Sequence, residues 1–387
     1  MRHIKLKEEY MKTINAPQLC PVLLYFLLHT VIVFGAAIIV GDSMMLKPGG
    51  FVNTLLPKTY IIVEKFIKWD AHWYTYVAQQ GYDSLSIVFF PMLIYFIKIT
   101  AGLFNFDYGL AGFFICNVFS LICFFLMYAL FQLDFSRTIS ARALLVFAVM
   151  PTSIFLHSIY TEALFLTFSL ACAYYARTGK WWRAGLFGSM ATLTRNMGVF
   201  LVCLIIYEFW DQYKKERPSQ RFSKYCVLAI ALPALALLGF IIYNYWLLGD
   251  PLAFVSSQKA WGREFSPPWI NIGNGFIQVL HGAKLAVVLD LLIVVLGIIG
   301  LLSMTFLPGL NIPKSYLVIS WIWLLIPLCS TSPWMPLYSM SRFVLVIFPL
   351  YLFIAQIPAC LFRIFILSSA LGMALCSIWF TNWHWVS

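Results

Sequence analysis

The sequence predicts an all-α membrane protein that crosses the bilayer many times. Of its 387 residues, 62% are hydrophobic and only 11% are charged, whereas a soluble domain carries about 25% charged residues. The apolar residues form runs long enough for membrane helices, which need roughly 20 residues to cross the hydrocarbon core. Lys and Arg collect in short loops between these runs, which is typical of membrane proteins with basic cytoplasmic loops.

The charge and the cysteines exclude other classes of protein. A net charge of +11 would indicate nucleic-acid binding in a soluble protein. Here the basic loops explain the charge, and no basic patch with interleaved aromatics stands on a soluble module, so nucleic acid is not an expected partner. The nine cysteines lie singly in or beside apolar runs without a CxxC pair, which favours buried free thiols over disulfides or a zinc site.

The positive-inside rule assigns a side to each loop. The basic N-terminal residues place the N-terminus in the cytoplasm, and the run from Cys20 to Val40 is long enough to be an uncleaved first span. Further spans are expected at 109–131, 143–158, 161–176, 225–248, 283–306, 315–329, 343–357 and 364–380. Segment 87–104 is interrupted by Pro91 and Lys98 and is expected to be interfacial or re-entrant.

Segment 184–207 does not fit a simple span. It is interrupted around Arg195, and both of its flanks, 177–183 and 213–224, are strongly basic. Because both flanks should be cytoplasmic, we expect two half-helices bent at Arg195. The sequence thus predicts about ten or eleven membrane segments in a single domain over 1–387. Its long outer loops are expected at about 42–86, 249–282 and 330–342.

The unusual polar residues fall on the outer side of this topology. They are Asp70 and His72 in the first loop, Tyr160, Thr161 and Glu162 at a helix turn, residues 250–269 in the second loop and 339–342 in the third. Polar groups at membrane depth are costly and usually functional. Interfacial snorkelling or helix capping is the alternative explanation.

Two acidic residues are candidates for chemistry. Asp70 lies in the aromatic stretch Lys68-Trp69-Asp70-Ala71-His72-Trp73-Tyr74. A carboxylate in an aromatic pocket can act as a general base, and an exposed loop residue or a helix N-cap is an equal alternative. For Glu162 the favoured interpretation is simpler, because an acid in the first turn of a helix complements the helix dipole.

Three cations, Lys259, Arg263 and Arg342, are expected on the outer side, where the positive-inside rule does not require them. Arg binds phosphate bidentately, so a phosphate-bearing lipid head group would explain them. A rim ion pair such as Arg263 with Glu264 is the alternative. Arg195, inside an apolar stretch, fits either a buried ion pair or a lipid phosphate.

A metal site is not apparent in the sequence. His72 with Asp70 is a weak metal pair, and no dense cluster of ligands or nucleotide-binding loop is present. No cofactor is therefore indicated, and a divalent-cation requirement stays open.

At these residues the sequence resembles the GPI mannosyltransferase II (PIG-V) family. Each motif is weak by itself, but five in the same order and spacing, from about Lys68 to the C-terminus, are specific. The matching blocks are Trp69-Asp70-Ala71-His72-Trp73-Tyr74 with 79–82 and 89–91, Pro151 to Phe165, Leu193 to Gly198, Gly249 to Trp269, and Ser341-Arg342-Phe343 with Phe348-Pro349. Thr161 replaces the usual Ser of the family, and Asn196 stands where Pro or Ser is common.

The resemblance implies a membrane glycosyltransferase of the GT-C superfamily, with an active site on the outer or luminal face. It implies a polyprenyl-phosphate sugar donor, commonly mannose on dolichol or undecaprenol, and inversion at the anomeric carbon. The acceptor would be a hydroxyl of a glycan or glycolipid. Because the chain is compact, we expect a prokaryotic homologue in the bacterial plasma membrane, or the ER membrane if it is eukaryotic. No partner subunit is indicated.

The resemblance also implies roles for the candidate residues. Asp70 would be the catalytic base, and Arg263, Arg342, Lys259 and Arg195 would bind the donor phosphate. The substrate-binding residues would be Trp69, His72, Trp73, Tyr160, Glu162, Gln258 and Trp261. A transporter or flippase of lipid-linked sugar is the main alternative, although transporters tend to show internal repeats and none is visible here. A structural subunit would need no converging polar residues.

Overall fold

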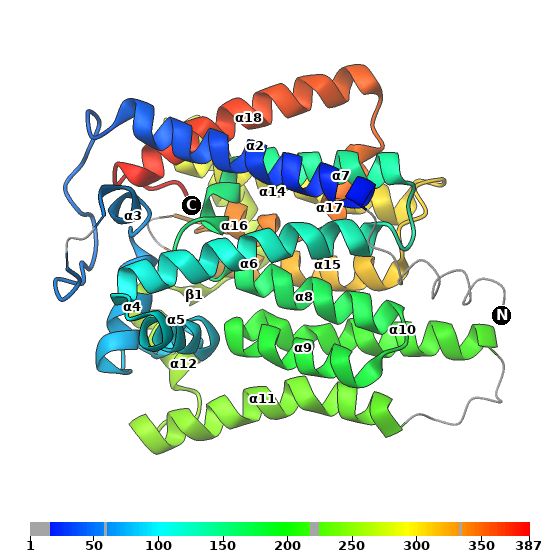
Figure 1. Ribbon diagram of the computed structural model, residues 1–387, viewed down its shortest axis with the longest axis horizontal. Coiled ribbons are helices and arrows are strands. Elements are labelled where there is room, and N and C mark those ends of the chain that lie inside the picture. Colours follow the sequence, from blue (N-terminus) through cyan, green and yellow to red (C-terminus); the bar gives the residue numbers. More distant parts are fainter. Residues whose placement is uncertain (1–15, 58–59, 217–223, 333–334) are drawn as a thin grey trace.

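The computed structural model describes residues 16–57, 60–216, 224–332 and 335–387. The basic N-terminal residues that assign the sides, and the charged segment 217–223, lie outside these ranges. Within them the chain is helical almost throughout, as expected. Figure 1 shows most of the long helices running in roughly the same direction along the long axis of the molecule.

The elements follow one another with mostly short connections, the long exception being residues 41–60. The α-helices are α2 (Ala16–Val40), α3 (Ile61–Lys65), α4 (Asp70–Gln80), α5 (Pro91–Phe104), α6 (Tyr108–Phe131), α7 (Arg137–Val149), α8 (Glu162–Arg177), α9 (Trp181–Thr194), α10 (Leu201–Glu216), α11 (Lys224–Leu248), α12 (Ala253–Ser256), α13 (Pro268–Leu280), α14 (Leu285–Phe306), α15 (Lys314–Leu328), α16 (Met340–Leu345), α17 (Pro349–Ala355) and α18 (Ala359–Thr381). The 3₁₀ helices are η1 (Ser86–Val88), η2 (Pro151–Leu156), η3 (Asn196–Phe200) and η4 (Ser257–Trp261). Strands β1 (Glu264–Phe265) and β2 (Ser330–Thr331) pair antiparallel, with Glu264 opposite Thr331.

Five helices of the described chain are long and apolar enough to cross a membrane: α2 from Cys20, α6, α11 from Tyr225, α14 and α18. Each coincides with an expected span. Shorter helices fill the rest of the bundle, and α5 and α15 are apolar among them. Two expected spans are each split, 143–158 after Val149 and 343–357 before Pro349. Pro151 and Pro349 begin the new elements, because proline has no N–H to continue the preceding helix.

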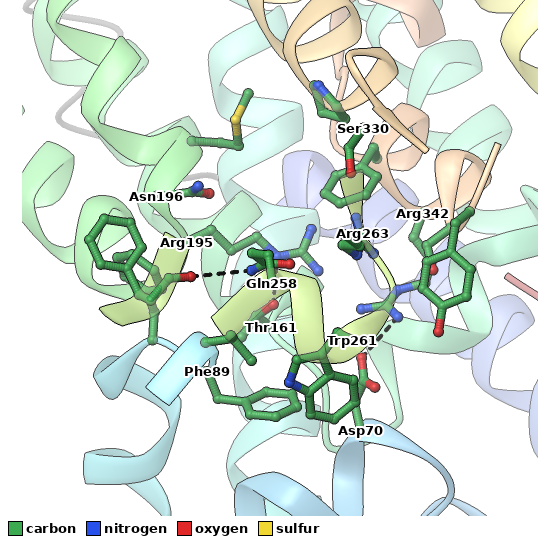
Figure 2. A pocket seen from close by; sticks show the side chains of 18 of the residues that line it. Asp70, Phe89, Thr161, Arg195, Asn196, Gln258, Trp261, Arg263, Ser330 and Arg342 are labelled. Atoms are coloured by element: carbon green, nitrogen blue, oxygen red, sulfur yellow. Dashed lines mark hydrogen bonds and ion pairs between the residues drawn. The ribbon is translucent and has the colours of Figure 1, made fainter. Parts of the chain in front are cut away.

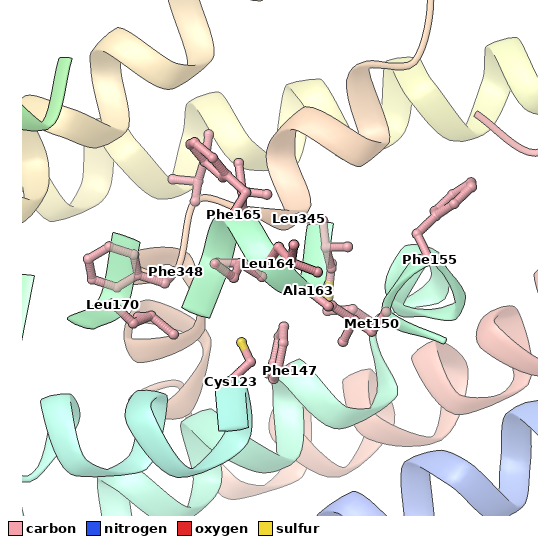
Figure 3. Close-up of a cluster of buried hydrophobic side chains, with 14 of the residues drawn as sticks. Cys123, Phe147, Met150, Phe155, Ala163, Leu164, Phe165, Leu170, Leu345 and Phe348 are labelled. Carbon is pink, nitrogen blue, oxygen red and sulfur yellow. The ribbon is translucent and has the colours of Figure 1, made fainter. Parts of the chain in front are cut away.

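The central helix of the bundle is α8. From Glu162 to Ala173 every one of its residues is buried. Figure 3 shows the core around it, which includes Leu164 and Phe165 of α8, Phe147 of α7 and Phe348. Because α8 is enclosed by protein, the position of its first residue, Glu162, is determined by packing on all sides.

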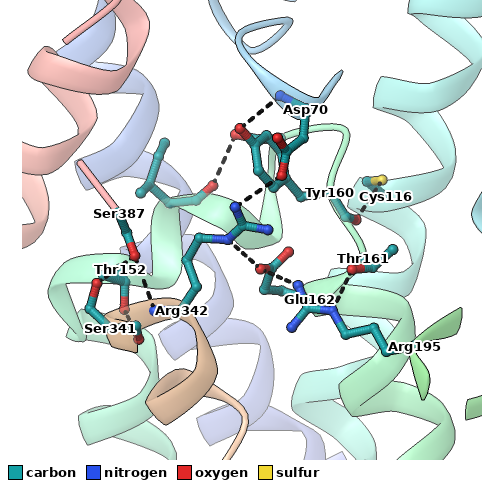
Figure 4. Close-up of polar contacts among 12 residues, drawn as sticks. Asp70, Cys116, Thr152, Tyr160, Thr161, Glu162, Arg195, Ser341, Arg342 and Ser387 are labelled. Carbon is teal, nitrogen blue, oxygen red and sulfur yellow. Dashed lines mark hydrogen bonds and ion pairs between the residues drawn. The ribbon is translucent and has the colours of Figure 1, made fainter. Parts of the chain in front are cut away.

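Two polar ends bound this bundle. At one end Arg177 forms ion pairs with Asp134 and with Glu208, the latter at 3.2 Å, and Ser315 donates to Glu208 at 2.5 Å. At the other end lie Asp70, Glu162, Arg195 and Arg342, which we call the site end (Figure 4). The loops expected in the cytoplasm and the polar residues expected on the outer side thus lie at opposite ends of the bundle.

The expected bend at Arg195 is present. Helix α9 ends at Thr194, and Arg195 has an extended backbone (φ −151°, ψ 142°) before η3 and α10. Gln212 near the end of α10 donates to the carbonyl of Ala176 at 2.9 Å. The start of α9 and the end of α10 therefore lie together at the end of the bundle opposite the site end. Arg195 lies between the two half-helices, at the site end.

The second and third loops hold more structure than expected. The segment 249–282, expected to be a long outer loop, contains the 13-residue helix α13 as well as α12 and η4. The short pairing of β1 with β2 joins this segment to the segment at 330–342. This pairing brings Arg263 next to the loop that carries Arg342.

Candidate active site

The site end contains a cavity of about 330 Å³. Figure 2 shows that it is bounded by side chains from the first loop, the tip at Arg195 and the second and third loops. Its polar lining includes Asp70, Thr161, Arg195, Asn196, Gln258, Arg263, Ser330, Tyr338, Ser339 and Arg342. Its apolar lining includes Val88, Phe89, Phe254, Val255, Ile326 and Pro327. The cavity is therefore lined by one acid, three cations and a set of apolar side chains.

Four charged side chains form one connected network beside the cavity (Figure 4). The buried Glu162 Oε1 accepts from Arg195 Nη2 at 2.5 Å and from Arg342 Nε at 2.8 Å. Arg342 Nη1 also donates to Asp70 Oδ2 at 3.0 Å. Two acids and two Arg residues are thus linked in series, Asp70 to Arg342 to Glu162 to Arg195. Buried charges are stable only when paired in this way.

Asp70 begins α4, and its side chain is 25% exposed, the most accessible acid of this network. The preceding residue, Trp69, has φ 53° and ψ −117°, a conformation that costs a non-glycine residue free energy and persists where the surroundings impose it. The Tyr160 hydroxyl provides such a restraint, because it accepts from the Asp70 N–H and donates to the Lys68 carbonyl, both at 3.3 Å. The Asp70 carboxylate is thereby directed to the cavity.

Glu162 lies behind the cavity rather than in its lining. Its side chain is fully buried, and Oε1 is already bonded to two guanidinium groups. The helix-dipole role that the sequence favours for Glu162 therefore does not account for its main contacts, which are with Arg195 and Arg342. Glu162 holds Arg195 and Arg342 at fixed positions, and through Arg342 it also orients Asp70.

Arg263 differs from the other two cavity arginines. It has no carboxylate partner among the described residues, and Glu264, the alternative partner, is exposed in β1. Its guanidinium lies over the rings of Tyr338 at 4.8 Å and Phe343 at 5.9 Å. Burial lowers the pKa of Arg263, but a guanidinium stays protonated in proteins. Arg263 is therefore a half-buried cation available to an anionic ligand.

Other candidate residues lie at or around the cavity. Gln258 and Trp261 line it. The Trp261 indole donates to the Leu85 carbonyl at 2.9 Å and packs against Trp73, which lies in a second layer. Lys259 is exposed on η4 outside the lining.

His72 lies away from the cavity lining. Its Nδ1 accepts from the Asn53 N–H at 3.2 Å, and its ring stacks on Trp383. Burial, with the nearby Lys68, lowers the pKa of His72 to about 4, so the ring is neutral at pH 7. Across the described chain, no three His, Cys, Asp or Glu side chains lie close enough to hold a metal ion.

Tyr338 and Trp385 are lining residues that the sequence does not single out. Tyr338 and Trp385 stack on each other with ring centroids 5.1 Å apart, and both line the cavity. Trp385 lies just after α18. The three tryptophans at 379, 383 and 385, within seven residues, are the signal that the sequence offers.

A helical membrane bundle whose loops enclose an Asp- and Arg-lined cavity is typical of a membrane-embedded enzyme. A profile of the family described as mannosyltransferase (PIG-V) matches residues 14–273, more than half of the chain. The chain belongs to this family. No curated protein matches it.

Solved structures with a similar path of the chain come from the oligosaccharyltransferase of Archaeoglobus fulgidus. The structure tethered to an acceptor peptide with an NVT sequon has a TM-score of 0.43 at 11% identity, covering 93% of this chain and 55% of that one. The complex with an inhibitory peptide and a dolichol-phosphate has a TM-score of 0.38 at 10% identity, covering 92% and 55%. The chain thus spans about half the length of these proteins.

Proposed function

We propose that the protein transfers a mannosyl, or another hexosyl, residue from a polyprenyl-phosphate donor to a hydroxyl of a glycan or glycolipid acceptor. The transfer inverts the anomeric carbon and takes place on the outer or luminal face of the membrane. One observation carries the proposal: a single cavity presents the Asp70 carboxylate together with Arg195, Arg263 and Arg342. Family membership supplies the class of reaction.

In the proposed reaction Asp70 acts as the general base. It accepts the proton of the acceptor hydroxyl while that oxygen forms a bond to C1 of the sugar. The bond from C1 to the phosphate oxygen breaks, and the polyprenyl phosphate leaves with the electron pair. The ion pair with Arg342 uses Oδ2 of Asp70, and a carboxylate has a second oxygen that can receive the proton.

The leaving phosphate gains negative charge, which fixed cations stabilise best when they need not reorganise. Arg263 is the first candidate, because it has no carboxylate partner among the described residues. Arg342 and Arg195 are held rigidly by Glu162, so their remaining N–H groups are pre-oriented. Lys259 would contribute only from the exposed margin.

The apolar lining of the cavity suits the first isoprene units of the donor. It includes Val88 of η1, the adjacent Phe89, Phe254 of α12 and Ile326 of α15. A lipid-linked sugar needs this combination, because its head group is anionic and its tail is apolar.

The test uses the purified full-length protein in liposomes, with radiolabelled polyprenyl-phosphate mannose and a soluble mannoside acceptor outside. Transfer of label to the acceptor, with the anomeric configuration reversed in the product, supports the proposal. Movement of the labelled lipid between leaflets without transfer to any acceptor contradicts it and supports the flippase alternative. Parallel reactions with Mg²⁺, Mn²⁺ or a chelator determine whether a divalent cation is required.

A further inference from the structure

The segment 382–387 folds back across the site end. It leaves α18 through Asn382, whose carbonyl accepts from the Leu46 N–H at 3.1 Å. His384 Nε2 lies 3.0 Å from the carbonyl of Met44. Between them Trp383 has φ 65°, a left-handed conformation that is unfavourable for a residue with a side chain. The segment is thus bent sharply against the first loop.

Trp385 lies between Arg263, the cation proposed to bind the phosphate, and Asp70, the proposed base. The Arg263 guanidinium lies 4.8 Å from the centre of the Tyr338 ring, and Tyr338 stacks on Trp385 at 5.1 Å. The Trp385 ring then meets Trp69 edge-on at 5.0 Å, and Trp69 directly precedes Asp70. A continuous row of rings therefore runs from Arg263 to Asp70, with Trp385 at its middle and in the cavity lining.

A buried carboxylate anchors the end of this segment. Asp290 of α14 is 1% exposed, and its Oδ1 accepts from the Ser341 N–H at 2.8 Å and from Ser387 Oγ at 3.5 Å. Ser341 Oγ donates to Ser387 Oγ at 2.6 Å, and Ser387 Oγ accepts from the Arg342 N–H at 3.3 Å (Figure 4). The anchor therefore joins the segment to the backbone that carries Arg342.

The free-energy cost of burying Asp290 in a membrane helix supports a functional role for this residue. An acid inside an apolar membrane helix is expensive and is retained where it is needed. In the described chain Asp290 forms no ion pair. Among the described residues, its hydrogen bonds are only to Ser341, near the start of α16, and to Ser387. The buried acid therefore serves to position these two residues.

We propose that residues 382–387 form a strap, anchored by Asp290 through Ser341 and Ser387, which places Trp385 as the wall against which the donor hexose ring lies. This inference rests on the proposed function and assigns the specificity of that cavity for a sugar. The apolar face of a hexose packs on an indole ring, while its hydroxyls remain free for polar groups such as Gln258.

The kinetic test compares variants of the full-length protein with polyprenyl-phosphate mannose as donor. Trp385→Ala raises the donor KM about tenfold, and Trp385→Phe, which keeps an aromatic face, stays within about threefold of wild type. Asp290→Ala raises the donor KM in the same direction, whereas Asp290→Asn retains an acceptor oxygen and rescues it. Trp246→Ala, on a residue 78% exposed in α11, leaves KM unchanged.

A second measurement does not depend on turnover. Hydrogen–deuterium exchange of 382–387 is faster in Asp290→Ala and in Ser387→Ala than in wild type, and Ser368→Ala on the exposed side of α18 has no effect. Unchanged exchange in Asp290→Ala overturns the anchor, and an unchanged donor KM in Trp385→Ala overturns the wall. If the wild-type protein transfers no sugar while the exchange differences hold, the proposed function fails and the anchored strap stands without a sugar role.

Discussion

Replacement of Glu162 by Gln is the most informative change in the charged network. Glu162 is fully buried and accepts from Arg195 and Arg342. Glutamine has nearly the same shape, so the substitution removes the charge and little volume. Both guanidinium groups stay charged, so each hydrogen bond to the amide oxygen persists but loses the attraction of the carboxylate charge, at about 1 kcal/mol per bond. Two weakened bonds therefore cost about 2 kcal/mol, and the repulsion of the two guanidinium groups adds to this loss.

The expected result is a drop of about 5 °C in the melting temperature of the protein in detergent, since a destabilisation of 1 kcal/mol lowers the midpoint by a few degrees in a chain of this size. Transfer activity falls as well, because Arg342 turns further toward Asp70 and competes with the acceptor hydroxyl for its carboxylate. Glu264→Gln, at an exposed acid of β1, serves as the matched control. A Glu162→Gln protein with wild-type melting and wild-type turnover would refute the account of this network.

Three further predictions test other parts of the site. Arg263→Gln raises the donor KM about tenfold or more, and Arg263→Lys recovers part of the loss. Arg183→Gln, at the opposite end of the bundle, leaves the donor KM unchanged. Equal KM values in the two Gln variants would show that Arg263 does not bind the donor. Because the pKa of His72 is lowered to about 4 from its ordinary 6.5, the unfolded chain binds a proton between these values and the folded chain does not. Stability therefore falls as the pH drops from 6.5 to 4, and melting curves of His72→Phe show a flatter pH dependence. Gly198→Ala places a Cβ 2.3 Å from the backbone of Ala191 and lowers both the melting temperature and activity, whereas Gly239→Ala, with no atom within 4 Å, folds normally in the same assays.

Much of the architecture follows from local features of the sequence. Apolar runs predict the five long helices because lipid requires length and low charge. The bend at Arg195 is predicted from the charge of its flanks, because a straight span would place one basic segment on the wrong side. The split at Pro349 is less obvious, because proline is tolerated inside many membrane helices.

The site is only partly predictable, because its contacts are long-range. Asp70 and Arg342 are each recognisable as unusual, but 272 residues separate them and no local pattern shows that they pair. The left-handed backbone of Trp69 has no sequence signal, since glycine is the residue that usually marks such a position. Asp290 lies in an apolar run that reads as an ordinary span, so its partners Ser341 and Ser387 become apparent only in the fold.

The central claim, that Asp70 is the base of a sugar transfer, is tested most directly by the turnover of Asp70→Asn with polyprenyl-phosphate mannose. Asparagine keeps the size of the side chain but cannot accept the proton, so kcat should fall by about 10²–10⁴. Asp42→Asn, at an exposed acid of the same loop that pairs with Lys65, should retain the wild-type kcat. Full turnover by Asp70→Asn under the same conditions would contradict the account.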